Sequence, residues 1–194
     1  KVKIVDLGVV AISNVFVHVL EEQIEDPNQS YIFLDIGAQN THFVIYRGNG
    51  ILFTKEINIG GVIITEEIQR QMGVNYNEAE DLKIIGDENG NLPEEIVEII
   101  EDVLESFFAE IKKTVDFYIT STSDDSLSGI VVTGGGALIP GLLEGLETLL
   151  GFPASVLSPF EKMEYDRKKF SEDQLNMISF RGGVAMGLAM RSLH

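Results

Sequence analysis

The sequence of 194 residues contains no cysteine, no tryptophan and only three histidines. The lack of cysteine excludes a disulfide framework and a thiolate metal site, and three scattered histidines argue against a zinc site. Basic residues are scarce too: 14 lysines and arginines stand against 31 aspartates and glutamates, a formal charge of −17. Such a surface repels phosphate backbones, so we expect no nucleic-acid partner.

Long hydrophobic runs are also missing. No apolar stretch approaches the roughly 20 residues that cross a bilayer, and the N-terminus lacks the order of regions found in a signal peptide. We therefore expect no direct insertion into a membrane. The apolar content of 44% is sufficient for an ordinary globular core. The sequence begins without methionine, inside an expected strand at residues 2–5, and we expect it to be part of a longer protein.

Hydrophobic periodicity predicts strands and helices in an order typical of an α/β protein. Strands expected at 31–35, 41–47 and 51–59 form an antiparallel meander, in which Gly48-Asn49-Gly50 is a hairpin signal. Further strands are expected at 129–132 and 154–157, and helices at 9–20, 63–72, 77–83, 94–120, 139–150 and 175–192. We therefore predict a mixed five-stranded sheet, with a three-stranded antiparallel meander and parallel strands, flanked by helices.

The longest expected helix, at 94–120, has an apolar stripe and an acidic face. The stripe recurs every three to four residues, which is typical of a helix packed against a core. The acidic residues are Glu95, Glu98, Glu101, Asp102 and Glu105. We interpret them as a solvated face, because clustered charges on an amphipathic helix usually serve solubility. A metal cluster is the alternative.

A glycine turn after the strand at 31–35 is the first indication of a ligand site. Asp35 ends that strand and Gly37 follows it. An aspartate at the end of a buried strand is costly to desolvate unless it is paired, hydrogen-bonded or near a cation. It could hold Mg²⁺ beside a phosphate chain, because magnesium prefers carboxylate and water oxygens. Thr41 could add a hydroxyl, although threonine is also an ordinary strand residue. An Asp-x-Gly turn without a ligand is the alternative.

A second glycine turn, Gly134-Gly135-Gly136, follows the strand at 129–132. It is not a Walker A loop, because Leu142 stands where that motif needs lysine after Gly141. It is not a Rossmann fingerprint either, because Ile139 replaces the required glycine. Three consecutive glycines favour the close approach of a flat ligand to bare backbone over a merely flexible turn. If both turns serve one ligand, they must share a cleft.

Glu80 and Lys83 are three residues apart on the expected helix at 77–83. An i,i+3 salt bridge explains such a pair and is worth only about 0.2–0.5 kcal/mol. By itself the pair does not indicate a site.

The order of these motifs resembles the second lobe of the actin-like ATPases. More narrowly, the sequence resembles the PilM family of type IV pilus assembly proteins and, next, the FtsA family of cell-division proteins. The resemblance spans roughly residues 2–194. The motifs that carry it are Asp35-Ile36-Gly37 with Thr41, Ile59-Gly60-Gly61 with Thr65, Ala79-Glu80 with Lys83, Gly134-Gly135-Gly136-Ala137 with Ile139-Pro140-Gly141, Ser158-Pro159-Phe160, and Ala185 with Gly187-Leu188-Ala189.

The resemblance implies a ribonuclease H-like lobe that binds ATP or ADP with Mg²⁺. Its core would be residues 1–60 and 125–194, and a small helical subdomain at about 61–124 would contact the nucleotide. The N-terminal lobe would be absent. The implied nucleotide contacts are a second phosphate loop (Asp35, Gly37, Ala38, Gln39, Asn40 and Thr41, with Asp35 toward the metal), Gly60 and Gly61 beside the phosphates, Glu80 and Lys83 around the ribose and base, and an adenosine motif (Gly134, Gly135, Gly136, Ala137 and Ile139).

The function implied by the resemblance is a cytoplasmic, ATP-binding scaffold of type IV pilus assembly, held by partners at the inner face of the inner membrane. A PilN-like tail would bind the absent N-terminal lobe. Gly8 stands where relatives often carry an acidic group near the attacking water, so we expect slow or no ATP hydrolysis and no catalytic residue. Alternatives are an FtsA-like cell-division protein and a sugar or carboxylate kinase of the same superfamily, for which Asp6 is the only acid near the link between lobes.

Overall fold

A computed structural model describes residues 4–20, 26–48, 50–84, 91–158, 160, 169–171, 175 and 178–191. Its centre is a five-stranded sheet with the order β3-β2-β1-β4-β5. The strands are β1 (Ser30–Ile36), β2 (Thr41–Arg47), β3 (Gly50–Ile57), β4 (Leu127–Thr133) and β5 (Ala154–Val156). The first three form an antiparallel meander, and β1, β4 and β5 run parallel. The predicted mixed sheet is therefore confirmed.

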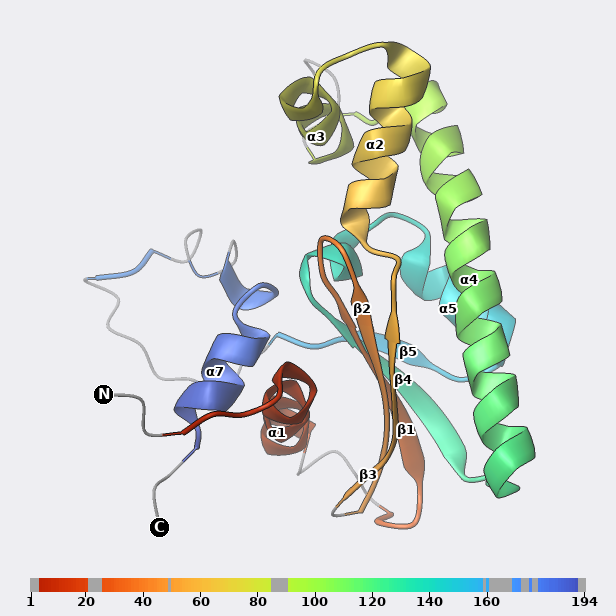
Figure 1. Ribbon diagram of the computed structural model, residues 1–194, viewed down its shortest axis with the longest axis vertical. Coiled ribbons are helices and arrows are strands. Elements are labelled where there is room, and N and C mark those ends of the chain that lie inside the picture. The colour runs from red at the N-terminus through yellow and green to blue at the C-terminus, as the bar shows by residue number, and fades with distance from the viewer. Residues whose placement is uncertain are drawn as a thin grey trace.

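Helices cover both faces of this sheet (Figure 1). The helices α1 (Gly8–Leu20) and α7 (Gly183–Ala189) lie on one face, and α4 (Glu94–Thr122) and α5 (Leu142–Leu150) lie on the other. The helices α2 (Gly61–Met72) and α3 (Tyr76–Ile84) extend beyond one end of the sheet, beside the N-terminal part of α4. Of the helices that the structure describes, none combines the length and apolarity needed to span a bilayer.

The central strand β1 contributes to two apolar cores because successive side chains of a strand point to opposite faces. Ile32 and Leu34 join the core beneath α4 and α5, whereas Phe33 joins the core beneath α1. Phe33 stacks on Phe16 of α1 with ring centroids 4.2 Å apart. A strand that is buried on both faces has a nearly continuous run of apolar residues in its sequence. This is why β1 and β4 can be predicted clearly from the sequence.

Helix α4 has the amphipathic form that its sequence predicts. Ile96, Ile100, Phe107, Ile111 and Val115 of the apolar stripe are buried in the core. The acidic residues of the opposite face, Glu95, Glu98, Glu101, Asp102 and Glu105, are exposed. Within the described residues, no group of three or more histidine, aspartate or glutamate side chains is placed to hold a metal ion. The exposure of these five side chains agrees with the solvated face that the sequence predicts.

Helices α1 and α7 approach each other more closely than most side chains permit. A Cβ atom built on Gly187 would lie 1.9 Å from the carbonyl oxygen of Ala11 and 2.4 Å from its carbonyl carbon. Both contacts are with backbone, so rotation of a side chain cannot relieve them. Glycine at position 187 is therefore needed for α7 to pack on α1.

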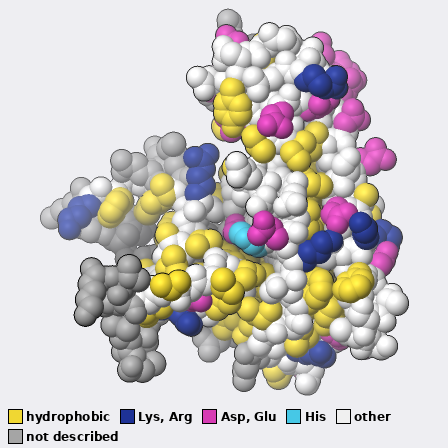
Figure 2. All heavy atoms as spheres, in the orientation of Figure 1, with side chains coloured by type: hydrophobic (Ala, Val, Ile, Leu, Met, Phe, Trp, Pro, Cys, Tyr) yellow, Lys and Arg dark blue, Asp and Glu magenta, His cyan; other side chains and the backbone are white. Residues whose placement is uncertain are grey.

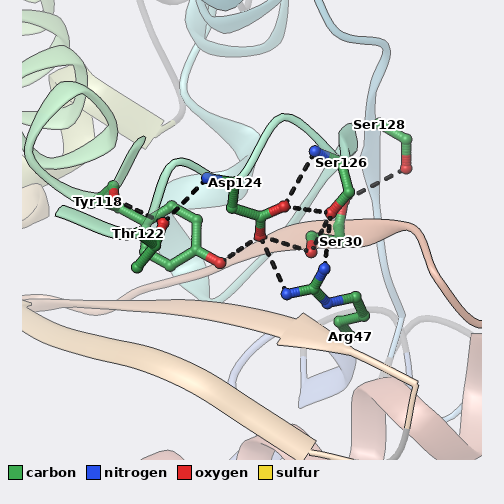
Figure 3. Close-up of polar contacts among 7 residues, drawn as sticks. All are labelled: Ser30, Arg47, Tyr118, Thr122, Asp124, Ser126 and Ser128. Carbon is green, nitrogen blue, oxygen red and sulfur yellow. Dashed lines mark hydrogen bonds and ion pairs between the residues drawn. The ribbon is translucent and has the colours of Figure 1, made fainter. Parts of the chain in front are cut away.

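A cluster of polar residues connects the C-terminal end of α4 to the strands β1 and β2 (Figure 3). The buried carboxylate of Asp124 accepts hydrogen bonds from Ser126 (Oγ, 2.7 Å), Ser30 (Oγ, 3.3 Å) and the hydroxyl of Tyr118. It also forms an ion pair with Arg47 at 3.4 Å. Burial works to raise the pKa of Asp124, but the hydrogen bonds and the nearby charge prevail and lower that pKa to about 2. Asp124 is therefore ionised in the folded protein at neutral pH.

Three expected elements differ from the structure. Ile4 and Val5, at the end of the strand expected at 2–5, are not in a strand, and residues 1–3 lie outside the described residues. The helix expected at 139–150 begins only at Leu142, after a 3₁₀ turn, η1 (Gly135–Leu138). The reason is local: Pro140 lacks an N–H, and Gly141 adopts a left-handed conformation with φ of 79°.

The helix expected at 175–192 is interrupted in the structure: the described residues 175, 178 and 179 are helical, and α7 covers Gly183–Ala189. The chain turns at residues 180–181, just before two glycines, which are poor helix formers. The turn also packs tightly: a Cβ on Gly182 would lie 2.4 Å from the ring of Phe160. Pro159 of the motif Ser158-Pro159-Phe160 lies outside the described residues.

Candidate functional site

The candidate site lies where the parallel strands β1 and β4 end side by side. Asp35 of β1 pairs in register with Thr133 of β4, so the loop after each strand starts at the same edge of the sheet. Ligands of open α/β sheets characteristically bind in the crevice at the carboxyl ends of the strands. The two glycine turns that the sequence singles out are these two loops.

A cleft of about 700 Å³ lies between these loops, α3 and the turn before α7. Figure 2 shows the hollow between the part of the molecule that holds α2 and α3 and the part that holds α7. The prediction that the two glycine turns share a cleft is confirmed. The predicted site residues that line it are Asp35, Gly37, Ala38, Gly61, Glu80, Lys83, Gly134, Gly135, Gly136 and Ile139.

Asp35 brings a partly buried carboxylate to the floor of the cleft. Its Oδ2 atom lies 3.5 Å from Nδ1 of His42, the residue opposite it on β2. Burial raises the pKa of Asp35 because it disfavours the charged form, and the neighbouring His42 offsets part of that rise. A carboxylate whose ionised form is destabilised by burial gains from a nearby cation, so Asp35 fits a metal-contacting role.

The loop after β1 is fixed by the start of α2. Gly61 N–H donates to the carbonyl oxygen of Gly37 at 3.1 Å, and Val62 N–H donates to that of Ala38 at 2.8 Å. A Cβ on Gly60 would lie 2.5 Å from the Ala38 oxygen, so glycine at position 60 permits this contact. The first turn of α2 thus uses two of its free N–H groups to position the loop.

Two of the three glycines after β4 are explained by packing against β1. Gly134 has φ of 87°, and a Cβ on it would lie 2.4 Å from the carbonyl oxygen of Ile36. A Cβ on Gly136 would lie 2.2 Å from the Ile36 side chain. Gly135 is different, because a Cβ there would have its nearest neighbour, Nε of Arg181, at 3.9 Å. The packing of Gly134 and Gly136 therefore exposes the backbone of Gly135 to the cleft.

Lys83 and Glu80 form a hydrogen-bonded group with Thr65 of α2. Lys83 Nζ lies 2.7 Å from Glu80 Oε2 and 2.7 Å from Thr65 Oγ1. Burial tends to raise the pKa of Glu80, but the hydrogen bonds from Lys83 and Thr65 and the charges of Lys83 and Arg181 lower it overall. The predicted i,i+3 salt bridge is confirmed. Thr65, which the sequence analysis named only as part of the Ile59-Gly60-Gly61 motif, is its third member.

Some predicted site residues do not line the cleft. Gln39 is exposed in the turn, and Asn40 Nδ2 donates to Glu56 Oε1 at 2.7 Å. Thr41 is fully buried, and its hydroxyl donates to the carbonyl oxygen of Ile59 at 2.8 Å. Gly60 packs on the loop backbone and Ala137 lies in the apolar core. These residues shape the loops, and a direct ligand contact by any of them stays a prediction.

Sequence reasoning missed several residues of the cleft. Its apolar wall includes Leu92 and Ile100, from the start of α4 and the residues before it, and Leu138 and Pro140, from the loop after β4. Arg181 adds a cation, and its guanidinium has no hydrogen-bond or ion-pair partner among the residues that the structure describes. The apolar wall residues could not have been found from the sequence, because they look like ordinary core positions. Arg181 could have been noticed as a basic residue beside Gly182-Gly183 in a strongly acidic chain.

Comparison with known proteins supports this architecture. The profile of a family described as type IV pilus assembly protein PilM matches residues 1–193. The cell division protein FtsA of Buchnera aphidicola subsp. Acyrthosiphon pisum is 26% identical over 163 residues, which cover 70% of this chain and 39% of FtsA.

Two solved structures are also similar to this chain. A PilM–PilN type IV pilus biogenesis complex is matched with a TM-score of 0.78 and 28% identity over 97% of this chain and 52% of that one. MreB5 of Spiroplasma citri bound to ADP is matched with a TM-score of 0.64 and 20% identity, over 98% of this chain and 60% of MreB5; this likeness shows the actin-like fold alone. The chain thus spans less than two thirds of each of these relatives. Because the family profile covers nearly all of it, the chain belongs to the PilM family of type IV pilus assembly proteins.

Proposed function

We propose that the chain is the nucleotide-binding lobe of an actin-like type IV pilus assembly protein. The observation that carries this proposal is the shared cleft, in which a carboxylate-bearing loop and a bare-backbone loop face one another at the carboxyl ends of β1 and β4. Its volume of about 700 Å³ is in the range of small-molecule sites. The fold is shared with MreB5 of Spiroplasma citri, whose structure contains ADP.

The residues of the cleft fit an adenine nucleotide with Mg²⁺. Asp35 would hold the metal, which supplies positive charge to neutralise phosphate oxygens. The backbone of Gly135 and the side chain of Ile139 would lie against the adenosine. Arg181, which also lines the cleft, would place its guanidinium near the phosphates, since planar guanidinium groups bind phosphate oxygens in pairs. In a chain with a formal charge of −17, such local cations are needed to hold an anion.

The chain would form the C-terminal of two lobes in its parent protein. Support comes from its coverage of about half of the PilM chain in the PilM–PilN complex (52%). The core would be residues 1–60 and 125–194, with α2, α3 and α4 as a helical subdomain at about 61–124. An N-terminal lobe would provide the remaining phosphate contacts when the two lobes close on ATP.

The parent protein would act as a scaffold at the inner face of the inner membrane. Its partner would be a PilN-like protein, whose tail binds the N-terminal lobe, and ATP would favour the closed form with slow or no hydrolysis. The carboxylates that line the cleft are, within the described part of the chain, Asp35 and Glu80. Glu80 is already held by Lys83 and Thr65, which leaves it unsuited to accept a proton from water.

An FtsA-like role in cell division is the second candidate, and the FtsA similarity over 70% of the chain favours it. The family match over residues 1–193 makes pilus assembly the better supported role. A sugar or carboxylate kinase finds no support in the cleft. Asp6, the acid that it would require, does not line the cleft, and its carboxylate lies 2.9 Å from Nε of Arg191.

Isothermal titration of the chain with ATP and Mg²⁺ tests this proposal. We expect weak binding, with a dissociation constant above roughly 1 μM, because one lobe provides only part of the phosphate contacts. Asp35→Asn should weaken the Mg²⁺-dependent part of the binding, whereas Asp81→Asn, an exposed change on α3 outside the cleft, should not. Submicromolar binding would contradict the need for a second lobe, and no binding at millimolar ATP would contradict the proposed function.

A further inference from the structure

We propose that a small apolar void beneath the two glycine loops is a joint, at which the helical arm of the molecule moves relative to the sheet. The helical arm is α2, α3 and residues 94–102 of α4. The void has a volume of about 10 Å³, and Ile64 and Ile139 form the wall between it and the cleft, because they line both. The joint itself does not depend on the proposed nucleotide function, but its effect on a ligand rests on that function.

Both connections of the chain between the sheet and the helical arm pass this void. The chain enters the arm after β3, where Ile59 and Gly60 line the void. It returns toward the sheet along α4, where Val103, Leu104 and Phe107 line the void. An arm that moves as a unit must turn about its connections, so the void lies where such a movement is centred.

Elsewhere α2 and α3 have few contacts with the sheet. The main contacts of α2 are with α3 and α4, and those of α3 are with α2. Figure 1 shows both helices beyond the end of the sheet. The backbone of α2 is joined to the loop after β1 by two hydrogen bonds, which the N–H groups of Gly61 and Val62 donate to carbonyl oxygens of that loop. A movement of the arm away from the loop breaks these two hydrogen bonds, so their amides report on it.

The void provides the free space that such a movement needs. Protein interiors are close-packed, so two packed elements resist displacement. Side chains that line a void lack contacts on one side and can move into it without a clash. The side chains around this void are all apolar and offer no partner to a water molecule, so it stays dry. Ile36, before the first glycine loop, and Ile139, at the end of the second, both line it. Movement at the void therefore reaches both loops.

Hydrogen–deuterium exchange of the full chain, without nucleotide, tests the joint. Val103→Ile adds a methyl group that fills part of the void, and Val103→Ala enlarges the void. Val97→Ile and Val97→Ala are the matched controls, because Val97 lies on the same helix, is 36% exposed and does not line the void.

In wild type we expect the amides of Gly61 and Val62 to exchange faster than those of β1 and β2, because the arm opens locally. Val103→Ile should slow their exchange by at least about threefold, and Val103→Ala should accelerate it by at least about threefold, as for methyl groups gained or lost in a core. The Val97 variants should change it by less than about 1.5-fold. The joint is refuted if these two amides exchange as slowly as those of β1 and β2 in wild type. It is also refuted if the Val103 variants leave their exchange unchanged or if Val103→Ile accelerates it.

The effect on the ligand is measured as the dissociation rate of a fluorescent ADP analogue, displaced by excess ADP with Mg²⁺. We expect Val103→Ile to slow dissociation by about threefold, since release requires the two loops to separate. An unchanged dissociation rate beside slowed amide exchange would refute the role of the joint in ligand release. If wild type does not bind the analogue, the proposed function fails, and amide exchange alone decides the joint.

Discussion

Replacing Gly187 by alanine should lower the free energy of unfolding by at least about 3 kcal/mol. The added methyl group would lie 1.9 Å from the carbonyl oxygen of Ala11, so α7 must separate from α1 by more than an ångström or leave it. Separation uncovers the apolar side chains that the two helices bury, including Ile12 and Met186. Urea unfolding followed by circular dichroism measures the loss.

Gly50→Ala is the matched control for this change. A Cβ on Gly50 meets nothing within 4 Å, so its substitution should alter the free energy of unfolding by less than about 1 kcal/mol. A Gly187→Ala protein as stable as the control would show that α1 and α7 are not packed as closely as the structure has them.

Replacing Asp124 by asparagine should destabilise the fold by about 2–4 kcal/mol at pH 7. The amide keeps an acceptor oxygen for Ser126, but an NH2 group, which cannot accept, replaces the oxygen that takes the hydrogen bonds from Ser30 and Tyr118. It also leaves Arg47 without its counter-ion. Asp116→Asn is the control, because Asp116 is 59% exposed and pairs with Lys112 across one turn of α4. That change should cost less than about 0.5 kcal/mol.

The effect of Asp124→Asn should also depend on pH in a defined direction. The folded pKa of Asp124 is lowered from 3.8 to about 2, so the folded state favours the ionised form. The stability from this group is therefore fully present above its unfolded pKa and is lost as the pH falls from about 4 toward 2. The difference between wild type and Asp124→Asn should be constant between pH 5 and 8 and shrink below pH 4. A difference that grows on acidification would refute this account.

Much of the fold follows from local patterns. The strands β1 and β2 are predicted almost to the residue because each is bounded by turn signals and filled with apolar residues. The stripe of α4 is predicted because one face of a long helix must be apolar to pack. The two glycine loops are also predictable, since glycine between a buried strand and a helix needs a steric or ligand reason.

What the sequence does not show depends on contacts between distant residues. Asp124 looks like part of a polar loop, and only the fold brings Arg47 and Ser30 to it. Lys83 and Glu80 look like a surface salt bridge, and only the packing of α3 on α2 adds Thr65 and Gly61. Arg181 enters the cleft because the chain turns just before Gly182, where sequence periodicity predicts an uninterrupted helix.

The central claim is that the loops after β1 and β4 hold one nucleotide between them. The most direct test is a titration of isotope-labelled protein with ADP and Mg²⁺, followed by two-dimensional amide NMR spectra. The account predicts that the amide signals of residues 35–38 and 134–139 shift together and saturate at one dissociation constant. Shifts confined to one loop, or two loops that saturate at different concentrations, would contradict it.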